Sequence, residues 1–270
     1  MRRQWARHAI ENHGLSERHA CRLLGISRTT FRYQAKKQDD GEIREQLRQL
    51  AERKPRWGFR KMRDWLRNHG YRWNHKRVYR IYCQLGLNLR VKPKKRLPAR
   101  EPQTLVQPAV PNECWSMDFM SDSMTSGRTF RTFNIIDDFN RELLCVEVDT
   151  SLPSRRVIRV LDTIAAERGY PERIRSDNGT EFISHVMAGW AEQHGVELAF
   201  IQPGKPAQNA YIERFNRTYR EDVLDAYLFS KLDQVRDITA SWQEEYNADR
   251  PHESLQGLPP YEYAKTVLEP

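Results

Sequence analysis

Between residues 114 and 220 the sequence alternates strand-like and helix-like segments, and this order limits the fold more than any other feature. We expect strands at 115–120, 129–137 and 143–149, a helix at 154–168, a strand at 173–176, a helix at 183–194, a strand at 196–201 and a long helix from about residue 207. Turn residues between the first three strands predict antiparallel hairpins. The order βββαβαβα indicates an α/β fold in which helices cover a mixed sheet.

Three carboxylates lie along this pattern where they could meet at one edge of the sheet. Asp118 lies within a strand, Asp177 directly follows another strand, and Glu213 lies on the long helix, 35 residues after Asp177. Oxygen ligands of this kind suit hard divalent cations that serve phosphoryl chemistry. We therefore expect Asp118, Asp177 and Glu213 to be catalytic residues that hold a pair of Mg²⁺ ions, with Mn²⁺ as a substitute. Without cations the three acids would repel and raise one another's pKa.

The helix that carries Glu213 has other polar side chains at helical spacing. Four of them are predicted DNA contacts: Asn209, Asn216, Arg217 and Arg220. Arg220 is expected to meet a phosphate, and an ion pair with Glu213 or Glu221 is the alternative. Lys205, in the Gly-Pro loop before the helix, is another predicted DNA contact.

Three further acids fit structural roles. Asp137 and Asp138 end a strand at a turn, where solvated carboxylates that cap the turn are expected. Glu181 lies four residues after Asp177 and is expected to cap or anchor the next helix. Metal binding by Glu181 is the less favoured alternative.

The two parts of the chain differ in charge. Residues 1–110 hold 28 Lys or Arg and 9 Asp or Glu, whereas residues 111–270 hold 17 and 27. A basic part beside an acidic part indicates a region that grips nucleic acid, joined to one that holds cations. An ordinary charged surface is the alternative, and the DNA-binding patterns within the basic part argue against it.

Residues 1–35 are expected to form a helix-turn-helix domain. The expected helices lie at 3–13, 16–24 and 28–34. Ser16 is the expected N-cap of the second helix. Arg28, Thr29 and Arg32 project from the last helix, which would lie in the major groove of DNA. A small three-helix packing unit is the alternative.

Residues 36–90 are expected to form a second helix-turn-helix domain. The expected helices lie at 42–53, 60–68 and 75–85, and Trp65 and Tyr79 are expected in the core. The residues of the last helix that are predicted to contact DNA are Lys76, Arg77 and Arg80. Contact with backbone phosphates is the minimum expected of them.

Residues 91–110 form a basic, proline-rich linker. Proline and charge at this density oppose packing and favour an extended strap. The residues of this strap that are predicted to contact DNA are Lys92, Lys94, Lys95 and Arg96. A simple spacer is the alternative, although a spacer would need fewer charges.

Cysteine spacing and hydropathy point to an intracellular protein. The four cysteines have no metal-ligand spacing and are expected to be reduced thiols, and a zinc site at the amino terminus is rejected for the same reason. No apolar run approaches the ~20 residues that span a bilayer, and no signal peptide is expected. We expect a cytoplasmic protein with no membrane partner.

Residues 111–255 resemble the catalytic core of the DDE-transposase and retroviral-integrase superfamily. The motifs that carry the resemblance are Trp-Ser-Met-Asp-Phe (115–119), Ser-Asp-Asn-Gly (176–179), Gln-Asn-Ala-Tyr-Ile-Glu-Arg-Phe-Asn (208–216) and Tyr-Asn-Ala-Asp-Arg-Pro-His-Glu-Ser-Leu (246–255). The chain is most similar to the OrfB-type transposases that bacterial insertion sequences encode in a second reading frame. Residues 42–87 resemble the helix-turn-helix that precedes the core in these proteins.

The resemblance implies an RNase H-like catalytic core over residues 111–229, followed by a C-terminal helical segment over 230–270. It implies the three acids above as the catalytic triad, with Arg220 as a basic partner. The implied substrates are double-stranded DNA at the element's terminal inverted repeats, cleaved with Mg²⁺, and target DNA that the freed 3′-OH attacks. The implied protein partners are further copies of the chain and the upstream first-frame product. In this family the first-frame product usually brings a leucine-zipper helix for multimerisation, and no leucine-zipper heptads occur in this sequence.

The expected function is therefore a DNA transposase. One alternative is a non-catalytic DNA-binding regulator of the element, and another is a nuclease that hydrolyses DNA without joining it. Acidic residues at all three positions argue against the regulator.

Overall fold

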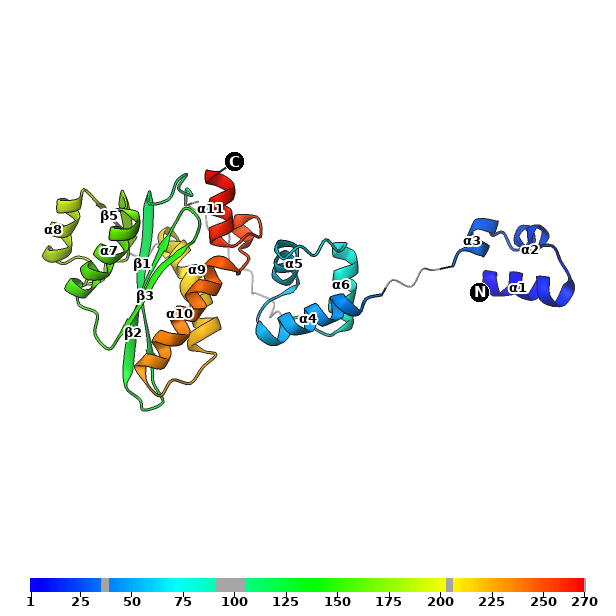
Figure 1. The fold of residues 1–270 in the computed structure, drawn as a ribbon, viewed down its shortest axis with the longest axis horizontal. Helices are drawn as coiled ribbons and strands as arrows, with labels where there is room; N and C mark the ends of the chain where they lie inside the picture. The colour runs from blue at the N-terminus through cyan, green and yellow to red at the C-terminus, as the bar shows by residue number, and fades with distance from the viewer. Residues whose placement is uncertain (35–38, 91–104, 203–205, 270) are drawn as a thin grey trace. The chain divides into compact units, whose positions relative to one another are not determined.

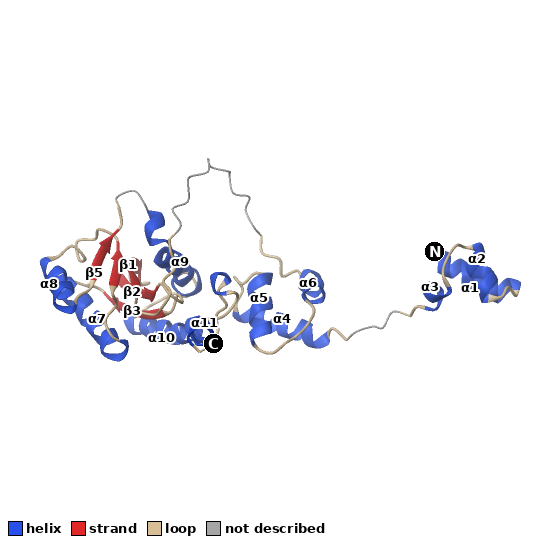
Figure 2. Ribbon diagram, turned by 90° about the horizontal axis from the view of Figure 1, so that it is seen from above, coloured by secondary structure: helices blue, strands red, loops and turns tan. Residues whose placement is uncertain are grey.

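The computed structural model describes residues 1–34, 39–90, 105–202 and 206–269 (Figure 1). The chain divides into two compact units, residues 1–45 and 46–270. The first unit is helical, whereas the second combines helices with a sheet (Figure 2). None of the described helices is both long and apolar enough to cross a bilayer, and the four cysteines are free thiols.

The first unit contains the helices α1 (Arg2–His13), α2 (Glu17–Leu23) and α3 (Arg28–Arg32). Ser16 caps α2, because its hydroxyl accepts a hydrogen bond from the His19 amide at 3.3 Å. Ser27 caps α3 in the same way, through the Thr30 amide at 3.0 Å. Each hydroxyl satisfies an amide that the helix leaves without a partner, so both helix starts follow from the sequence.

The second set of helices is α4 (Gly41–Arg53), α5 (Phe59–Asn68) and α6 (His75–Gln84). The boundary between the two compact units lies within α4. Apolar side chains from the three helices are buried, among them Leu47, Met62, Leu66, Val78 and Ile81. Asn74 caps α6, since its side chain accepts a hydrogen bond from the Lys76 amide at 2.9 Å.

The two aromatic residues expected in this core differ in burial. Trp65 is 8% exposed, as predicted, but the prediction for Tyr79 is wrong because 49% of its surface is exposed. Tyr79 follows Val78, which faces the core, so the helical rotation of about 100° per residue carries the ring towards solvent. There it packs against Phe59, with the ring centroids 4.8 Å apart.

The described strands form one mixed sheet in the second unit. Its strands are β1 (Cys114–Ser123), β2 (Thr129–Asp137), β3 (Leu143–Asp149), β4 (Arg173–Ser176) and β5 (Glu197–Phe200). Their order across the sheet is β3-β2-β1-β4-β5. The β1–β2 and β2–β3 pairs are antiparallel, whereas the β1–β4 and β4–β5 pairs are parallel. The first three strands are therefore the predicted hairpins, and β4 and β5 extend the sheet on the side of β1.

Helices cover both faces of the sheet (Figure 1). The helices of the second unit that follow the first three strands are α7 (Ser154–Arg168), α8 (His185–His194), α9 (Ala210–Tyr219), α10 (Leu232–Ala248) and α11 (Pro260–Leu268). Side chains of α7 and α8 form one hydrophobic core with the sheet, and side chains of α9 and α10 form the other. This three-layered α/β arrangement is the predicted fold class.

Strand alternation decides which layer each β1 side chain enters. Trp115 and Met117 belong to the core under α7 and α8, whereas Met120 packs in the core under α9 and α10. Successive side chains of a strand point to opposite faces. Asp118 therefore shares the face of Met120 and points towards the α9 layer.

Element boundaries match the sequence patterns closely where a cap or a turn defines them. The bounds of β2, β3, α7 and β4 are those predicted, whereas β1 runs three residues past its predicted end. The helix predicted from about residue 207 starts as a 3-10 turn at Pro206–Asn209 and becomes α9 at Ala210. It continues into a π-helical turn at Arg220–Leu224.

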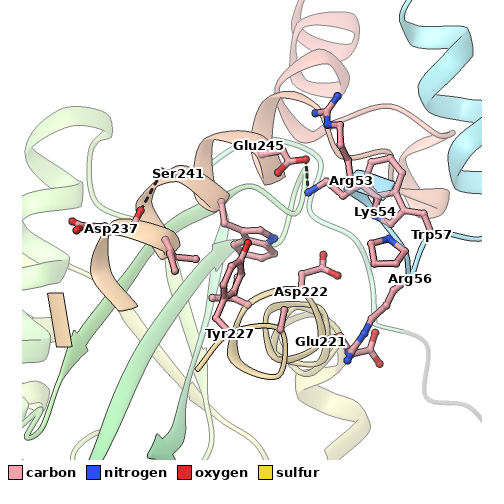
Figure 3. Close-up of a pocket in the computed structure, with 15 residues that line it drawn as sticks. Arg53, Lys54, Arg56, Trp57, Glu221, Asp222, Tyr227, Asp237, Ser241 and Glu245 are labelled. Carbon is pink, nitrogen blue, oxygen red and sulfur yellow. Dashed lines mark hydrogen bonds and ion pairs between the residues drawn. The ribbon is translucent and has the colours of Figure 1, made fainter. Parts of the chain in front are cut away.

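Within the second unit, the α4–α6 domain docks on the part of the core that includes α10 and the segment after it. Lys54, just after α4, forms an ion pair with Glu245 of α10 at 2.5 Å (Figure 3). The Trp65 indole nitrogen donates to both carboxylate oxygens of Asp249 at 2.8 Å. A cavity of about 520 Å³ lies at this junction, and Trp57 and residues of α10 line it (Figure 3).

Candidate active site

Two of the three predicted catalytic acids lie on or directly after neighbouring strands, Asp118 within β1 and Asp177 immediately past the end of β4. Ser116 of β1 is paired with Arg175 of β4 in parallel register. Two residues further along each chain are Asp118 and Asp177, so continuing this register brings them level. Because neighbouring strands lie about 4.8 Å apart, the sheet places both aspartates at one edge.

Asp118 is half-buried and fully engaged in hydrogen bonds. Its Oδ1 accepts from the Phe119 amide at 2.8 Å, and its Oδ2 accepts from Asn216 Nδ2 at 2.7 Å. Burial raises the pKa of Asp118 to about 6, although these hydrogen bonds oppose the rise. The negative charges of Asp177 and Glu213 contribute to the rise, so the three acids interact electrostatically.

The loop after β4 holds Asp177 in place. Asp177 Oδ1 accepts a hydrogen bond from the Gly179 amide at 3.1 Å. A Cβ atom on Gly179 would lie 3.0 Å from that oxygen and 3.4 Å from the Phe182 ring, so a side chain at this position would crowd the aspartate. Phe182 is buried and stacks on Phe119, with the ring centroids 4.9 Å apart. The aspartate loop is thereby tied to the strand that carries Asp118.

A pair of asparagines links the sheet, α9 and Asp118. Asn134 of β2 is fully buried, and its Nδ2 donates to Asn216 Oδ1 at 2.7 Å. Asn216 in turn donates to Asp118, which fixes the orientation of that carboxylate. Asn216 was predicted to contact DNA, but the structure ties it to the acid. Asn209, with the same prediction, is only 3% exposed.

Glu213 lies in the first turn of α9 and is exposed. Among the residues that the structure describes, no three Asp, Glu, His or Cys side chains lie close enough to hold one metal ion. The three acids are therefore close enough to interact through their charges but do not form a closed cage in this conformation.

The donor set nevertheless fits a hard divalent cation. All three side chains offer carboxylate oxygens, the ligands that Mg²⁺ and Mn²⁺ prefer. A cation beside Asp118 would offset both the burial and the repulsion that raise its pKa. Asp118 is held by hydrogen bonds on β1 and Asp177 by the loop after β4, whereas Glu213 is exposed on α9.

Arg220 does not form either of the ion pairs considered as alternatives to phosphate contact. Its guanidinium lies 3.3 Å from Asp122 Oδ2 and donates to the Ser121 carbonyl oxygen at 2.9 Å. Asp122 and Ser121 belong to the end of β1, so Arg220 links α9 to that strand. Arg217, one turn before, is exposed.

The predicted DNA contacts of the helical domains are mainly at the surface. Arg28, Thr29, Lys76 and Arg80 are exposed, and Arg77 is half-buried. Arg32 is exposed and forms an ion pair with Glu17 at 2.9 Å. Five predicted contacts lie outside the described residues: Lys92, Lys94, Lys95, Arg96 and Lys205.

The prediction that Asp137 and Asp138 are solvated is wrong, because both are fully buried. Asp137 does cap the turn, since it accepts a hydrogen bond from the Phe139 amide at 2.9 Å. Arg168 lies 3.3 Å from Asp137, and Arg175 lies 2.7 Å from Asp138. Arginines from α7 and β4 replace the water that was expected. The side chain of Glu181, expected to cap or anchor the next helix, instead forms an ion pair with Arg131 of β2. Only its backbone carbonyl oxygen meets the α8 cap, accepting a hydrogen bond from Ser184 at 3.2 Å.

The chain resembles proteins of bacterial insertion elements along nearly its whole length. The uncharacterized 39.2 kDa protein of insertion element IS476 from Xanthomonas euvesicatoria is 40% identical over 264 residues, which cover 97% of this chain and 76% of that protein. The uncharacterized 31.7 kDa protein of IS407 from Burkholderia multivorans is 40% identical over 255 residues, covering 94% and 92%. The transposase of IS904 from Lactococcus lactis is 24% identical over 231 residues, covering 79% and 89%.

The chain belongs to the insertion-element transposase family. Within this DDE and integrase superfamily, integrase core domain models match residues 108–206 and 194–260, and an HTH-like domain model matches residues 37–96. The family assignment supports a DNA-processing enzyme of the transposase or integrase type. The cryo-electron microscopy structure of the simian T-cell lymphotropic virus intasome with PP2A regulatory subunit B56 gamma matches with a TM-score of 0.50. At 15% identity, over 81% of this chain and 74% of that chain, it shows a shared fold.

Sequence reasoning missed one group of basic residues in this family member. Lys61, Arg141, Arg214 and Arg250 line a second cavity of about 570 Å³. They come from α5, the β2–β3 turn, α9 and the segment after α10, so no spacing pattern connects them. The only local signals were the motifs that contain Arg214 and Arg250.

Proposed function

We propose that the chain cleaves the ends of its insertion element and joins the freed 3′-OH to target DNA. Asp118, Asp177 and Glu213 are the proposed catalytic residues and the proposed ligands of two Mg²⁺ ions, for which Mn²⁺ can substitute. The observation that supports the proposal most is the placement of Asp118 within β1 and Asp177 directly after the adjacent parallel strand β4, with the helix of Glu213 packed on β1.

The residues around the acids have distinct proposed tasks. Asn216 and the Phe119 amide hold the Asp118 carboxylate in one orientation, and Asn134 holds Asn216. When bound, the divalent cations would activate the attacking oxygen and stabilise the leaving oxygen. Glu213 is the proposed mobile ligand, because it is exposed on α9 while hydrogen bonds hold Asp118 on β1 and Asp177 in the loop after β4.

The proposed partners are double-stranded DNA at the terminal inverted repeats and at the target. The exposed basic residues of α3 and α6, together with Arg217 and Arg220, are the proposed contacts among the described residues. The basic strap and Lys205 are proposed to add to them. Assembly of several copies on DNA, help from the upstream first-frame product and action in the cytoplasm belong to the same proposal.

The substitution Asp118→Asn tests the catalytic assignment. We expect it to abolish Mg²⁺-dependent cleavage of element-end DNA, because a neutral amide cannot replace a carboxylate ligand. DNA affinity should stay near that of the wild type. The matched control is Asp237→Asn, an exposed aspartate of α10, which should leave cleavage unchanged.

Cleavage that survives in Asp118→Asn would refute the assignment of the site. A duplex with a pre-cleaved end and a free 3′-OH then separates a transposase from a nuclease. The proposed function requires a joined product with target DNA, and hydrolysis without any joined product contradicts it.

A further inference from the structure

The cavity of about 570 Å³ lies on the side of α9 away from Asp118. Tyr211, Arg214 and Thr218 line it and are three and four residues apart, so they share one face of the helix. Asn216, which binds Asp118, is two positions from Arg214 and therefore about 200° around the helix from it. One helix thus presents a different surface to each site.

The cavity is lined by more basic than acidic side chains. Its charged lining consists of the four basic residues named above and Glu253. Glu253 is already paired with Arg60 at 2.7 Å, and Arg250 is paired with Asp222. Arg214 is exposed, and no described residue forms a hydrogen bond or ion pair with its guanidinium. The basic side chains therefore outnumber the acids that could neutralise them.

Two buried polar atoms in the cavity lining have no hydrogen-bond partner among the described residues. They are Arg141 Nη1 and His252 Nε2. Arg141 is only 7% exposed, and its guanidinium stacks on Tyr211, 3.4 Å from the ring centroid. Buried polar groups in folded proteins nearly always have a partner. Arg141 Nη1 can only donate, so it is positioned for a ligand that accepts hydrogen bonds, and His252 Nε2 donates to the same ligand when it carries the ring proton.

The charge states of two lining residues agree with this geometry. Burial, reinforced by the positive charge of Arg250, lowers the pKa of Lys61 to about 7. Burial and the charges of neighbouring basic groups lower the pKa of His252 well below its usual value. Both pKa values are lowered because a buried positive charge without a counter-ion is unfavourable. A bound anion would stabilise the charged forms and raise both pKa values again.

We propose that this cavity binds a phosphate group of the DNA strand that lies along α9. This inference rests on the proposed function, which supplies the DNA. Arginine guanidinium groups donate paired hydrogen bonds to phosphate oxygens. Arg141 and Arg214 each bring one guanidinium group to the cavity. The volume suits a phosphate with part of its nucleotide, since ligand pockets typically measure ~300–1,000 Å³.

The first test measures DNA affinity against salt concentration for Arg214→Gln. This residue is exposed, so its substitution should leave the fold intact. We expect affinity to fall roughly tenfold at physiological salt, and the slope of log affinity against log salt to decrease by about one. The control Arg159→Gln removes an exposed arginine of α7, on the other face of the sheet, and should change neither quantity. Equal effects of the two substitutions would overturn the proposal.

The second test titrates inorganic phosphate into the full chain by calorimetry, without DNA. We expect saturable binding to the wild type that is lost in Arg141→Gln and in Arg214→Gln and kept in Arg159→Gln. Phosphate binding combined with unchanged DNA affinity in Arg214→Gln would identify a site for free phosphate and overturn the DNA assignment. No effect on either ligand would overturn the site itself.

The two tests also separate this inference from the proposed function. If the wild-type chain bound no DNA, the proposed function would fail, whereas the phosphate titration would still decide whether the cavity holds an anion. Asp118→Asn should bind phosphate as the wild type does, because Asp118 lies on the other side of α9. Loss of cleavage without loss of phosphate binding is thus the expected pattern for that variant.

Discussion

Lys61 lies in surroundings that disfavour the charged form of its ammonium group. Its pKa is lowered to about 7, mainly by burial and in part by Arg250 and Arg214, whereas Asp222 and Glu221 oppose the shift. The unfolded chain would restore an ordinary lysine pKa near 10.4. Between these two values the unfolded state binds more protons than the folded state, so stability should rise as pH increases from about 7 towards 10.

Replacing Lys61 with methionine removes this dependence while keeping a side chain of similar length. We expect Lys61→Met to be more stable than the wild type at pH 6, because the penalty of the charged form is then fully present. The difference should shrink as pH rises to 10. Hydrogen exchange of α5 amides, corrected for intrinsic rates at each pH, would measure the stability difference between Lys61→Met and the wild type. A stability difference that stays constant with pH would contradict the pKa shift.

Single residues show where sequence reasoning ends. Asp118, Asp177 and Glu213 could be named as candidates from their spacing, because acids at strand ends produce local patterns. The hydrogen bond between Asn216 and Asp118 could not be predicted, since it depends on how α9 crosses the sheet. Asp138 looked like a solvated turn residue, and its burial depends on Arg175 arriving from a strand that follows 37 residues later.

Strand β4 is short, and its two arginines differ in what they stabilise. Arg175 pairs with fully buried Asp138, whereas Arg173 pairs with Glu197 at the surface. Breaking a buried pair leaves an uncompensated charge, which typically costs ~3–5 kcal/mol. An exposed pair contributes ~0–1 kcal/mol. The strand's attachment to the sheet should therefore depend mainly on Arg175.

We expect Arg175→Gln to lower the free energy of opening of the sheet by about 3 kcal/mol. Native-state hydrogen exchange of β1 and β4 amides would measure the loss. Arg173→Gln, two residues earlier on the same strand, is the matched control and should cost less than about 1 kcal/mol. Equal losses would show that the buried pair has no special role.

Elements were predictable where their limits are encoded locally. Ser16 and Asn74 cap helices at the predicted positions, and the hairpin turns set the ends of β2 and β3. The start of α9 was less predictable, because a proline-bounded loop can enter a helix through a 3-10 turn of variable length. The π-helical turn after α9, which lies against α10, has no pattern in the sequence that marks it.

At the level of the whole second unit, the contact between the α4–α6 domain and the end of the integrase core includes one close approach at Gly257. Gly257 has φ of +80°, and a Cβ atom there would lie 2.8 Å from Asp64 Cγ and 3.1 Å from Arg67 Nη2. Asp64 and Arg67 belong to α5. The carbonyl oxygen of Gly257 accepts a hydrogen bond from Asn68 of the same helix at 2.8 Å.

Gly257→Ala should therefore loosen this docking. We expect faster hydrogen exchange in α5 and unchanged exchange in the sheet, because the added methyl group meets α5 and not the core. Gly127→Ala is the matched control, since Gly127 has φ of +81° and nothing within 4 Å of the added atom. Both variants share the backbone strain of a positive φ, so only their difference reports the lost contact.

The order of domains along the chain could be predicted, but their packing could not. Composition separated a basic helical part from an α/β part, and helix patterns located α4–α6. The contacts of Trp65 with Asp249 and of Lys54 with Glu245 join residues almost 200 positions apart. Side chains at that separation leave no periodicity in the sequence, so only the folded structure reveals that they meet.

Helix α9 carries Asn216, the link to Asp118, on one side and Arg214 on the other. An α-helix with its side chains is about 10 Å thick, which corresponds to roughly three steps of 3.4 Å along one DNA strand. The width of the helix would set a constant distance between the two sites on its sides. It would fix the offset, counted in nucleotides, between the point where the strand is gripped and the bond that is cut.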